Sequence, residues 1–198
     1  MRASRQLRTS RRWVPNRVSV AAVVVALLVA NCGGGGGGDL GTDVVNFFAN
    51  AFAPERTAVA FGAGRFVSVG KLFIEASDSG TGFTPVVGSD GQTIDDGVGY
   101  GVTYGAHGWL ATNGFVSPDG TVWSPITIPT TATVYGAAFG AGSYALVGAG
   151  GTVLVSSDAQ SWQAVDSGTN RDLLGIDYTN GQFVVVGRKG TILTSAGG

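Results

Sequence analysis

The sequence has very few residues that bind metals or form cross-links. Among 198 residues it has one cysteine, Cys32, and one histidine, His107. A single cysteine cannot form an intramolecular disulfide bond, so disulfide bonds do not hold this fold together. A conventional zinc site takes about four Cys, His or carboxylate ligands, and no cysteine lies near His107 in the sequence. We therefore expect no metal site and no cofactor.

Basic residues are scarce after Cys32. That part of the chain has six Lys and Arg against thirteen Asp and Glu, which gives a formal charge of −7. A surface with this balance repels the phosphates of nucleic acids and the headgroups of anionic lipids. The composition therefore excludes nucleic acid as a partner and argues against electrostatic binding to a membrane.

The other basic residues are at the N-terminus. Residues 1–17 contain six arginines and no acid, and residues 18–30 are apolar except for Ser19. A basic segment followed by a short apolar run is typical of a secretory signal peptide. The run is shorter than the roughly 20 residues that a membrane-spanning helix needs. We predict that residues 1–31 are a signal peptide and that the protein is exported.

The sequence Leu28-Val29-Ala30-Asn31-Cys32 resembles the lipobox of bacterial lipoproteins, although Asn31 departs from the Gly, Ala or Ser of that family. The resemblance implies cleavage before Cys32 and lipidation of its sulfur. Gly33, rather than Asp, after the cysteine implies sorting to the outer membrane. Residues 32–42, with six consecutive glycines, would form a flexible tether to the lipid anchor. The alternative is an incidental cysteine in an ordinary signal peptide.

Residues 43–198 contain four related segments: FGAGRFVSVG, YGAHGWLATN, FGAGSYALVG and YTNGQFVVVG. Each has an aromatic residue, a turn and a second aromatic residue that leads an apolar strand. Four short strands in about 40 residues is the size of a propeller blade. We predict an all-β fold, a β-propeller of about four four-stranded blades, with units near residues 57–88, 98–128, 134–166 and 173–198.

A turn rich in Ser and Asp follows the third strand of the first three units, as in SPDGTVW and SSDAQSW. It resembles the Asp-box, or BNR, turn of sialidase-type propellers. The phrase SGTNRDLLGIDYTNGQFVVVGRKGTILTS is similar to repeats of the photosystem II assembly factor family and to WD40/YVTN-like repeats. The resemblance implies a structural role, away from any active site, for Ser77, Asp78, Ser117, Asp119, Trp123, Ser156, Asp158 and Trp162.

The fourth unit ends before its box is complete, which leaves the closure of the ring open. The apolar segment 43–52 precedes the first unit, and as a strand it would complete the last blade and remove exposed sheet edges. Two alternatives are a homodimer, in which a second copy completes the ring, and a truncated relative that does not close.

Function is the least determined property of this sequence. The insertion SDGQTIDDG is our candidate contact loop, with Asp90, Asp95 and Asp96 in residues 88–99, because long loops on rigid scaffolds carry binding. The sialidase family uses an arginine triad and a tyrosine, and the arginines here fall at repeat-linked turns. We therefore expect a non-catalytic, membrane-tethered module that binds a protein or glycan. The alternatives are a sialidase-like glycan hydrolase and a family member without function.

Overall fold

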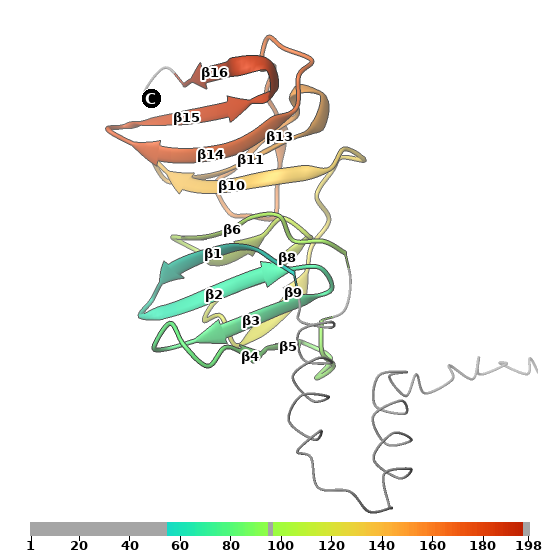
Figure 1. Ribbon diagram of the computed structural model, residues 1–198, viewed down its shortest axis with the longest axis vertical. Helices are drawn as coiled ribbons and strands as arrows, with labels where there is room; N and C mark the ends of the chain where they lie inside the picture. Colours follow the sequence, from blue (N-terminus) through green and yellow to red (C-terminus); the bar gives the residue numbers. More distant parts are fainter. Residues whose placement is uncertain (1–54, 95–96, 196–198) are drawn as a thin grey trace, which may run out of the picture. The chain divides into compact units, whose positions relative to one another are not determined.

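The computed structural model describes residues 55–94 and 97–195, which are short strands joined by tight turns (Figure 1). All of them belong to one compact unit, Phe52–Gly198. The predicted signal peptide, Cys32 and the tether lie outside the described residues. A helix with the length and hydropathy to span a membrane is absent from the described ranges.

The strands form four sheets that follow one another along the chain, and within each sheet consecutive strands pair antiparallel. The first contains β1 (Arg56–Gly62), β2 (Arg65–Gly70), β3 (Phe73–Ser77) and β4 (Thr84–Pro85). The second contains β6 (Val102–Gly105), β7 (Gly108–Ala111), β8 (Phe115–Ser117) and β9 (Val122–Pro125).

The third sheet contains β10 (Val134–Gly140), β11 (Ser143–Gly148), β12 (Val153–Ser156) and β13 (Gln163–Ala164). The fourth contains β14 (Leu173–Thr179), β15 (Gln182–Gly187) and β16 (Thr191–Thr194). Two short 3₁₀ turns, η1 (Ala149–Gly151) and η2 (Arg188–Gly190), join the second and third strands of these two sheets. The four sheets are the blades of a four-bladed β-propeller, which confirms the predicted fold class.

One strand departs from the repeat. β5 (Val87–Gly88) pairs parallel with β9 and extends the second blade to five strands. Two buried side chains, Val86 and Ile94, fix the flanks of this segment in the core of the first two blades. The insertion that the sequence shows after the first unit therefore lies along the outer edge of the second blade.

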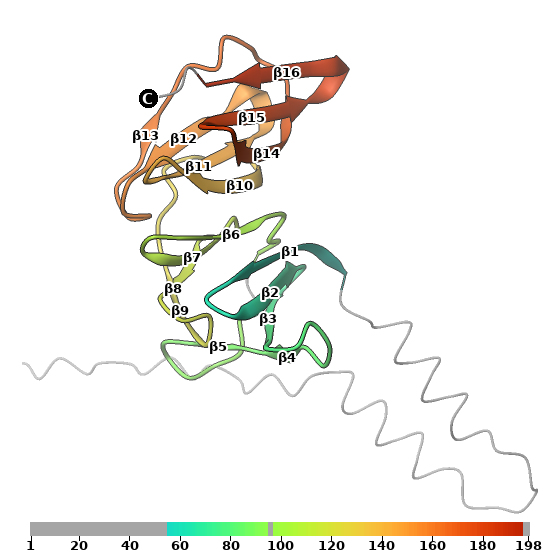
Figure 2. The same cartoon turned by 90° about the vertical axis from the view of Figure 1, so that its left-hand side faces the viewer.

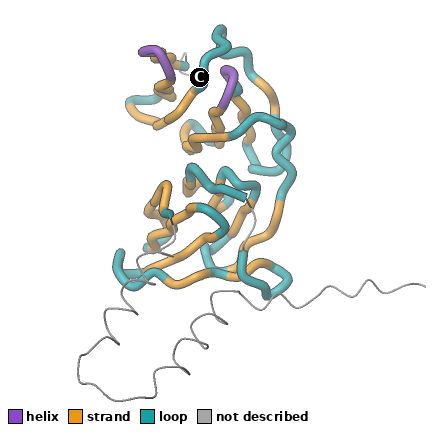
Figure 3. The backbone as a smooth tube through the Cα atoms, turned by 45° about the vertical axis from the view of Figure 1, so that its right-hand side comes forward, coloured by secondary structure: helices purple, strands orange, loops and turns teal. Residues whose placement is uncertain are grey.

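Neighbouring blades pack through their innermost strands: β1 contacts β6, β6 contacts β10, and β10 contacts β14 (Figure 2). Within the described residues β14 and β1 do not pack against each other in this way (Figure 1). Figure 3 shows the strands in orange, joined by loops along the described chain. Segment 43–52, predicted to be the closing strand, lies outside the described residues. Closure by that segment or by a second copy stays a prediction.

Glycines set the distance between blades. A side chain at Gly62 would meet the ring of Tyr104 at 2.3 Å, and one at Gly140 would meet that of Tyr178 at 2.0 Å. The innermost strands of the first three blades therefore each end in a glycine on which an aromatic ring of the next blade rests. The second strands add large side chains between the blades, among them Trp109 and Tyr144, each 1% exposed. The sheets thus share one stack of apolar interfaces.

Candidate functional site

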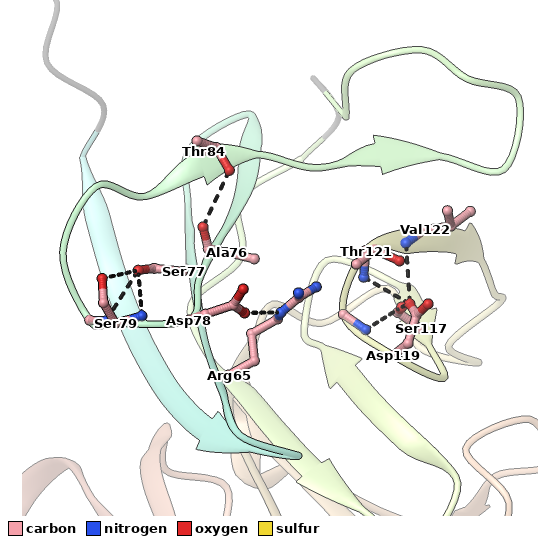
Figure 4. Close-up of polar contacts among 12 residues, drawn as sticks. Arg65, Ala76, Ser77, Asp78, Ser79, Thr84, Ser117, Asp119, Thr121 and Val122 are labelled. Atoms are coloured by element: carbon pink, nitrogen blue, oxygen red, sulfur yellow. Dashed lines mark hydrogen bonds and ion pairs between the residues drawn. The ribbon is translucent and has the colours of Figure 1, made fainter.

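We call the turns rich in Ser and Asp that follow the third strands Asp-box turns, after the motif that their sequences resemble. The second of these turns shows what their polar residues do (Figure 4). The Asp119 carboxylate accepts hydrogen bonds from the backbone amides of Thr121 at 2.8 Å and Val122 at 3.4 Å. The Ser117 hydroxyl accepts one from the Gly120 amide at 2.8 Å and donates one to Asp119 at 3.2 Å. These bonds, the one from the Thr121 amide first, lower the pKa of Asp119 to about 2. The side chains here satisfy the backbone of their own turn.

The third box repeats this geometry. Asp158 accepts hydrogen bonds from the amides of Gln160 and Ser161, both at 2.7 Å, and from the Ser156 hydroxyl at 2.9 Å. These bonds, led by that from Ser161, lower the pKa of Asp158. Ala159 takes the position of Gly120 and adopts its left-handed backbone, with φ of 58°. The turn therefore keeps its shape without the usual glycine.

The hydrogen bonds of Asp119 predict a pH dependence. Because its folded pKa lies below the ordinary 3.8, ionised Asp119 stabilises the fold above about pH 4. That contribution is lost as the pH falls through about 2. Asp119→Asn should therefore lower the urea midpoint at pH 7, and the gap to the wild type should narrow steadily between pH 4 and pH 2. A gap that stays constant over this range would contradict this role of the carboxylate.

The box tryptophans belong to the core. Trp123 is fully buried between the first two blades, whereas Trp162 is partly buried against the core of the third. The Asp-box residues of the second and third blades are therefore occupied by packing and turn formation, and none of them points a free reactive group into a cavity.

The acidic insertion is divided between described and undescribed residues. Asp90 is exposed, and its carboxylate accepts a hydrogen bond from the Gln92 amide at 3.0 Å, which forms a local turn. Asp95 and Asp96 lie outside the described residues. In the described ranges no three His, Cys, Asp or Glu side chains lie close enough to hold a metal ion. The described part of this loop forms a local turn, and its role as a contact surface stays a prediction.

An open cavity of about 450 Å³ lies beside the start of β6 and β10, and we call it the strand-start cavity. Its walls come from the segment before β6, the β7–β8 turn and the connection from β9 to β10. Residues that line it include Tyr100, Thr112, Asn113, Ile126, Ile128, Thr130 and Thr133. Because the Asp-box turns follow the third strands, they lie at the opposite end of the blades, so the two features face away from each other.

The strand-start cavity is neutral and amphipathic. None of its lining residues is Asp, Glu, His, Lys or Arg. Tyr100, 38% exposed, packs edge to face on Tyr135 with ring centroids 5.4 Å apart, which fixes its ring at the rim. The lining also combines apolar Ile126 and Ile128 with three threonines, Thr112, Thr130 and Thr133. Such a surface can desolvate a ligand and offer hydrogen bonds, but it contains no acid–base pair.

This cavity was not predicted from the sequence. Tyr100 and Tyr135 both precede a glycine near the start of the innermost strand, since Gly101 lies just before β6 and Gly136 lies in β10. Their equivalence could therefore be predicted from the repeat. The sequence predicts only a loop for the threonine-rich connection 126–133. That this connection lies close to the turn 112–114 follows from the geometry of the blade, which the sequence does not show.

Comparison with known proteins supports the fold. No protein-family model and no curated protein sequence matches the chain. A structure of YCF48 bound to a D1 peptide has a TM-score of 0.50 and 20% identity, over 73% of this chain and 51% of that one. The designed Ika4 protein has a TM-score of 0.54 and 15% identity, over 73% and 92% of the two chains.

The WD40 domain of Neurospora crassa Pan2 has a TM-score of 0.54 and 14% identity, over 73% of this chain and 47% of that one. The chain thus spans about half the length of the YCF48 and Pan2 chains. At these identities the likenesses show a shared propeller fold and nothing further.

Proposed function

We propose that this protein is a non-catalytic binding module that takes an extended, uncharged peptide segment of a partner protein in the strand-start cavity. The observation that carries the proposal is the lining of that cavity: a fixed tyrosine ring, two isoleucines and three threonines, with no charged residue. A peptide has alternating backbone polar groups and side chains, which match such a wall.

Two further points support a peptide as the ligand. The YCF48 propeller, which has a similar fold, is bound to a peptide in its own structure. A ligand that carries a charge would meet no opposite charge in this cavity and would lose its hydration without compensation. An uncharged segment avoids that loss.

We also propose that the module is exported and held at the cell envelope by lipid on Cys32. The support is the basic and apolar leader, the lipobox-like sequence and the glycine run. The partner would then be a protein of the envelope. Metabolic labelling with a radioactive fatty acid should mark the wild-type chain and leave Cys32→Ser unlabelled, and equal labelling of both would contradict the lipid anchor.

A matched pair of variants tests the binding site. Thr133 lines the cavity and Thr131, two residues earlier, does not, and both side chains are exposed. We would select binders from a phage-displayed library of linear 12-residue peptides on the purified full chain, and measure the affinity of the best synthetic peptide by calorimetry. Thr133→Lys should weaken binding about tenfold or more, because it puts an unpaired charge at the contact.

Thr131→Lys adds the same charge outside the cavity and should leave the affinity unchanged. Both variants should unfold at the same urea concentration as the wild type. Equal affinities of the two variants, or a library that yields no binder, would overturn the proposed site.

A further inference from the structure

The first Asp-box turn differs from the other two at its acidic residue. In the second and third turns the acid stands two residues after the first serine, as Asp119 and Asp158 do. In the first turn that position holds Ser79, whose hydroxyl accepts a hydrogen bond from the Thr81 amide at 3.3 Å. The acid is one residue earlier, at Asp78, and the turn forms without it.

Asp78 instead pairs with an arginine. The Arg65 Nε donates to Asp78 Oδ1 at 2.7 Å, where the Asp78 side chain is 73% exposed and that of Arg65 is 24% exposed. Arg65 also lies close to the second turn, since a side chain at Gly120 would meet its Cδ at 3.3 Å. Figure 4 shows the guanidinium group between the two turns. The arginine therefore lies between the two turns and is hydrogen-bonded to the first.

This pair leaves a donor and an acceptor side by side. Within the described residues the Arg65 Nη atoms and Asp78 Oδ2 have no hydrogen bond, because the pair uses only Nε and Oδ1. The residues equivalent to Arg65 in the other blades are Gly108, Ser143 and Gln182, so this arrangement occurs once among the described blades. The Arg65–Asp78 pair is therefore not part of the turn-forming role that the boxes share.

The pair borders a cavity of about 450 Å³ between the first two turns, which we call the box cavity. Besides Arg65 and Asp78, its lining includes the hydroxyl residues Ser77, Ser79, Thr84 and Thr121. The cavity therefore contains a carboxylate, a guanidinium and several hydroxyls, without a catalytic pair of acids.

We infer that the box cavity binds a neutral saccharide through two neighbouring hydroxyl groups. One sugar hydroxyl donates a hydrogen bond to Asp78 Oδ2, and the neighbouring hydroxyl accepts one from an Arg65 Nη. The carboxylate can only accept and the guanidinium can only donate, so a pair of hydroxyls satisfies both groups. This site lies at the opposite end of the blades from the strand-start cavity and does not depend on the proposed peptide site.

The test uses three simple sugars and the full chain in a detergent without a sugar headgroup. Methyl α-D-mannoside, methyl β-D-galactoside and methyl β-D-glucoside are screened by saturation-transfer NMR, followed by titration of any that bind. We expect at least one to bind, with weak affinity because the pair is open to water. Asp78→Asn and Arg65→Gln should each weaken that binding about tenfold.

Asp90→Asn is the matched control, because Asp90 is an exposed turn carboxylate with no arginine partner among the described residues, and it should bind as the wild type does. Thr133→Lys should also leave sugar binding intact, which separates this site from the peptide site. Asp78 is exposed, so its replacement leaves the fold in place, as circular dichroism would show. If none of the three glycosides binds, or if Asp78→Asn and Arg65→Gln bind as the wild type does, the inference is wrong.

Discussion

Trp123→Ala should lower the free energy of unfolding by about 3–5 kcal/mol, the largest loss that we expect from a single side chain in this protein. Trp123 is fully buried, and it packs with Trp109 and the valines of the first two blades. Its removal leaves a cavity in a rigid interface between sheets, which cannot collapse without displacing a blade. Urea unfolding followed by far-UV circular dichroism measures the loss.

Trp162 provides the comparison, because it occupies the equivalent position in the third box but is only partly buried. Trp162→Ala removes the same atoms from a site that water already reaches, so its loss should be clearly smaller. If the two variants lose the same stability, the tryptophan of the second box is not the central packing element that the structure shows.

Gly140→Ala should destabilise the protein by about 1–3 kcal/mol or more, although it adds only one methyl group. The new Cβ would lie 2.0 Å from Cγ of Tyr178, so this ring, or the whole fourth blade, must move. Tyr178 is itself held against Phe183, with ring centroids 4.9 Å apart, and cannot easily turn away. The backbone at Gly140 is not left-handed, so the expected loss reflects space between blades rather than strain.

The last blade contains the natural control. Thr179 is the residue that corresponds to Gly140 by register, and its side chain is exposed. Thr179→Ala should therefore change stability by less than about 0.5 kcal/mol. A tolerated alanine at position 140, or a large loss at position 179, would contradict the stacking of blades on their glycines.

Thr179 also bears on how the propeller ends. At Gly62, Gly105 and Gly140 an added side chain would collide with an aromatic ring of the following blade. Thr179 already has such a side chain, so the last blade cannot receive an aromatic ring in the same way. Phe61, the matching ring of the first blade, is 60% exposed. Closure or dimerisation through a direct copy of the blade interface would therefore require a rearrangement at Thr179.

The repeat made the fold predictable. Aromatic residues before and after each glycine turn recur at one position in every unit, and the structure uses them to pack the blades, as at Trp109 and Tyr144. β5 was not predictable, because a two-residue parallel pairing with Val122 and Trp123 has no local signature. Pairing between distant segments depends on where the turns direct the chain.

The sites were less predictable than the fold, for two physical reasons. The strand-start cavity is built from residues such as Tyr100 and Ile128, which look like ordinary core or loop residues until the blades bring them together. Asp78 matches the composition of an Asp-box, and the sequence therefore predicts for it the same role as for Asp119 and Asp158. The structure shows that a shift of one residue turns its carboxylate outward to Arg65, away from the backbone amides of the turn.

Amide hydrogen exchange of the full chain, with and without the selected peptide, is the most direct test of the central claim. We predict that binding slows exchange at the strand-start cavity, in the turn 112–114 and the connection 126–133, and leaves the Asp-box turns 117–122 and 156–161 unchanged. Protection confined to the Asp-box turns, or no protection at the cavity while the peptide is bound, would contradict the proposed function.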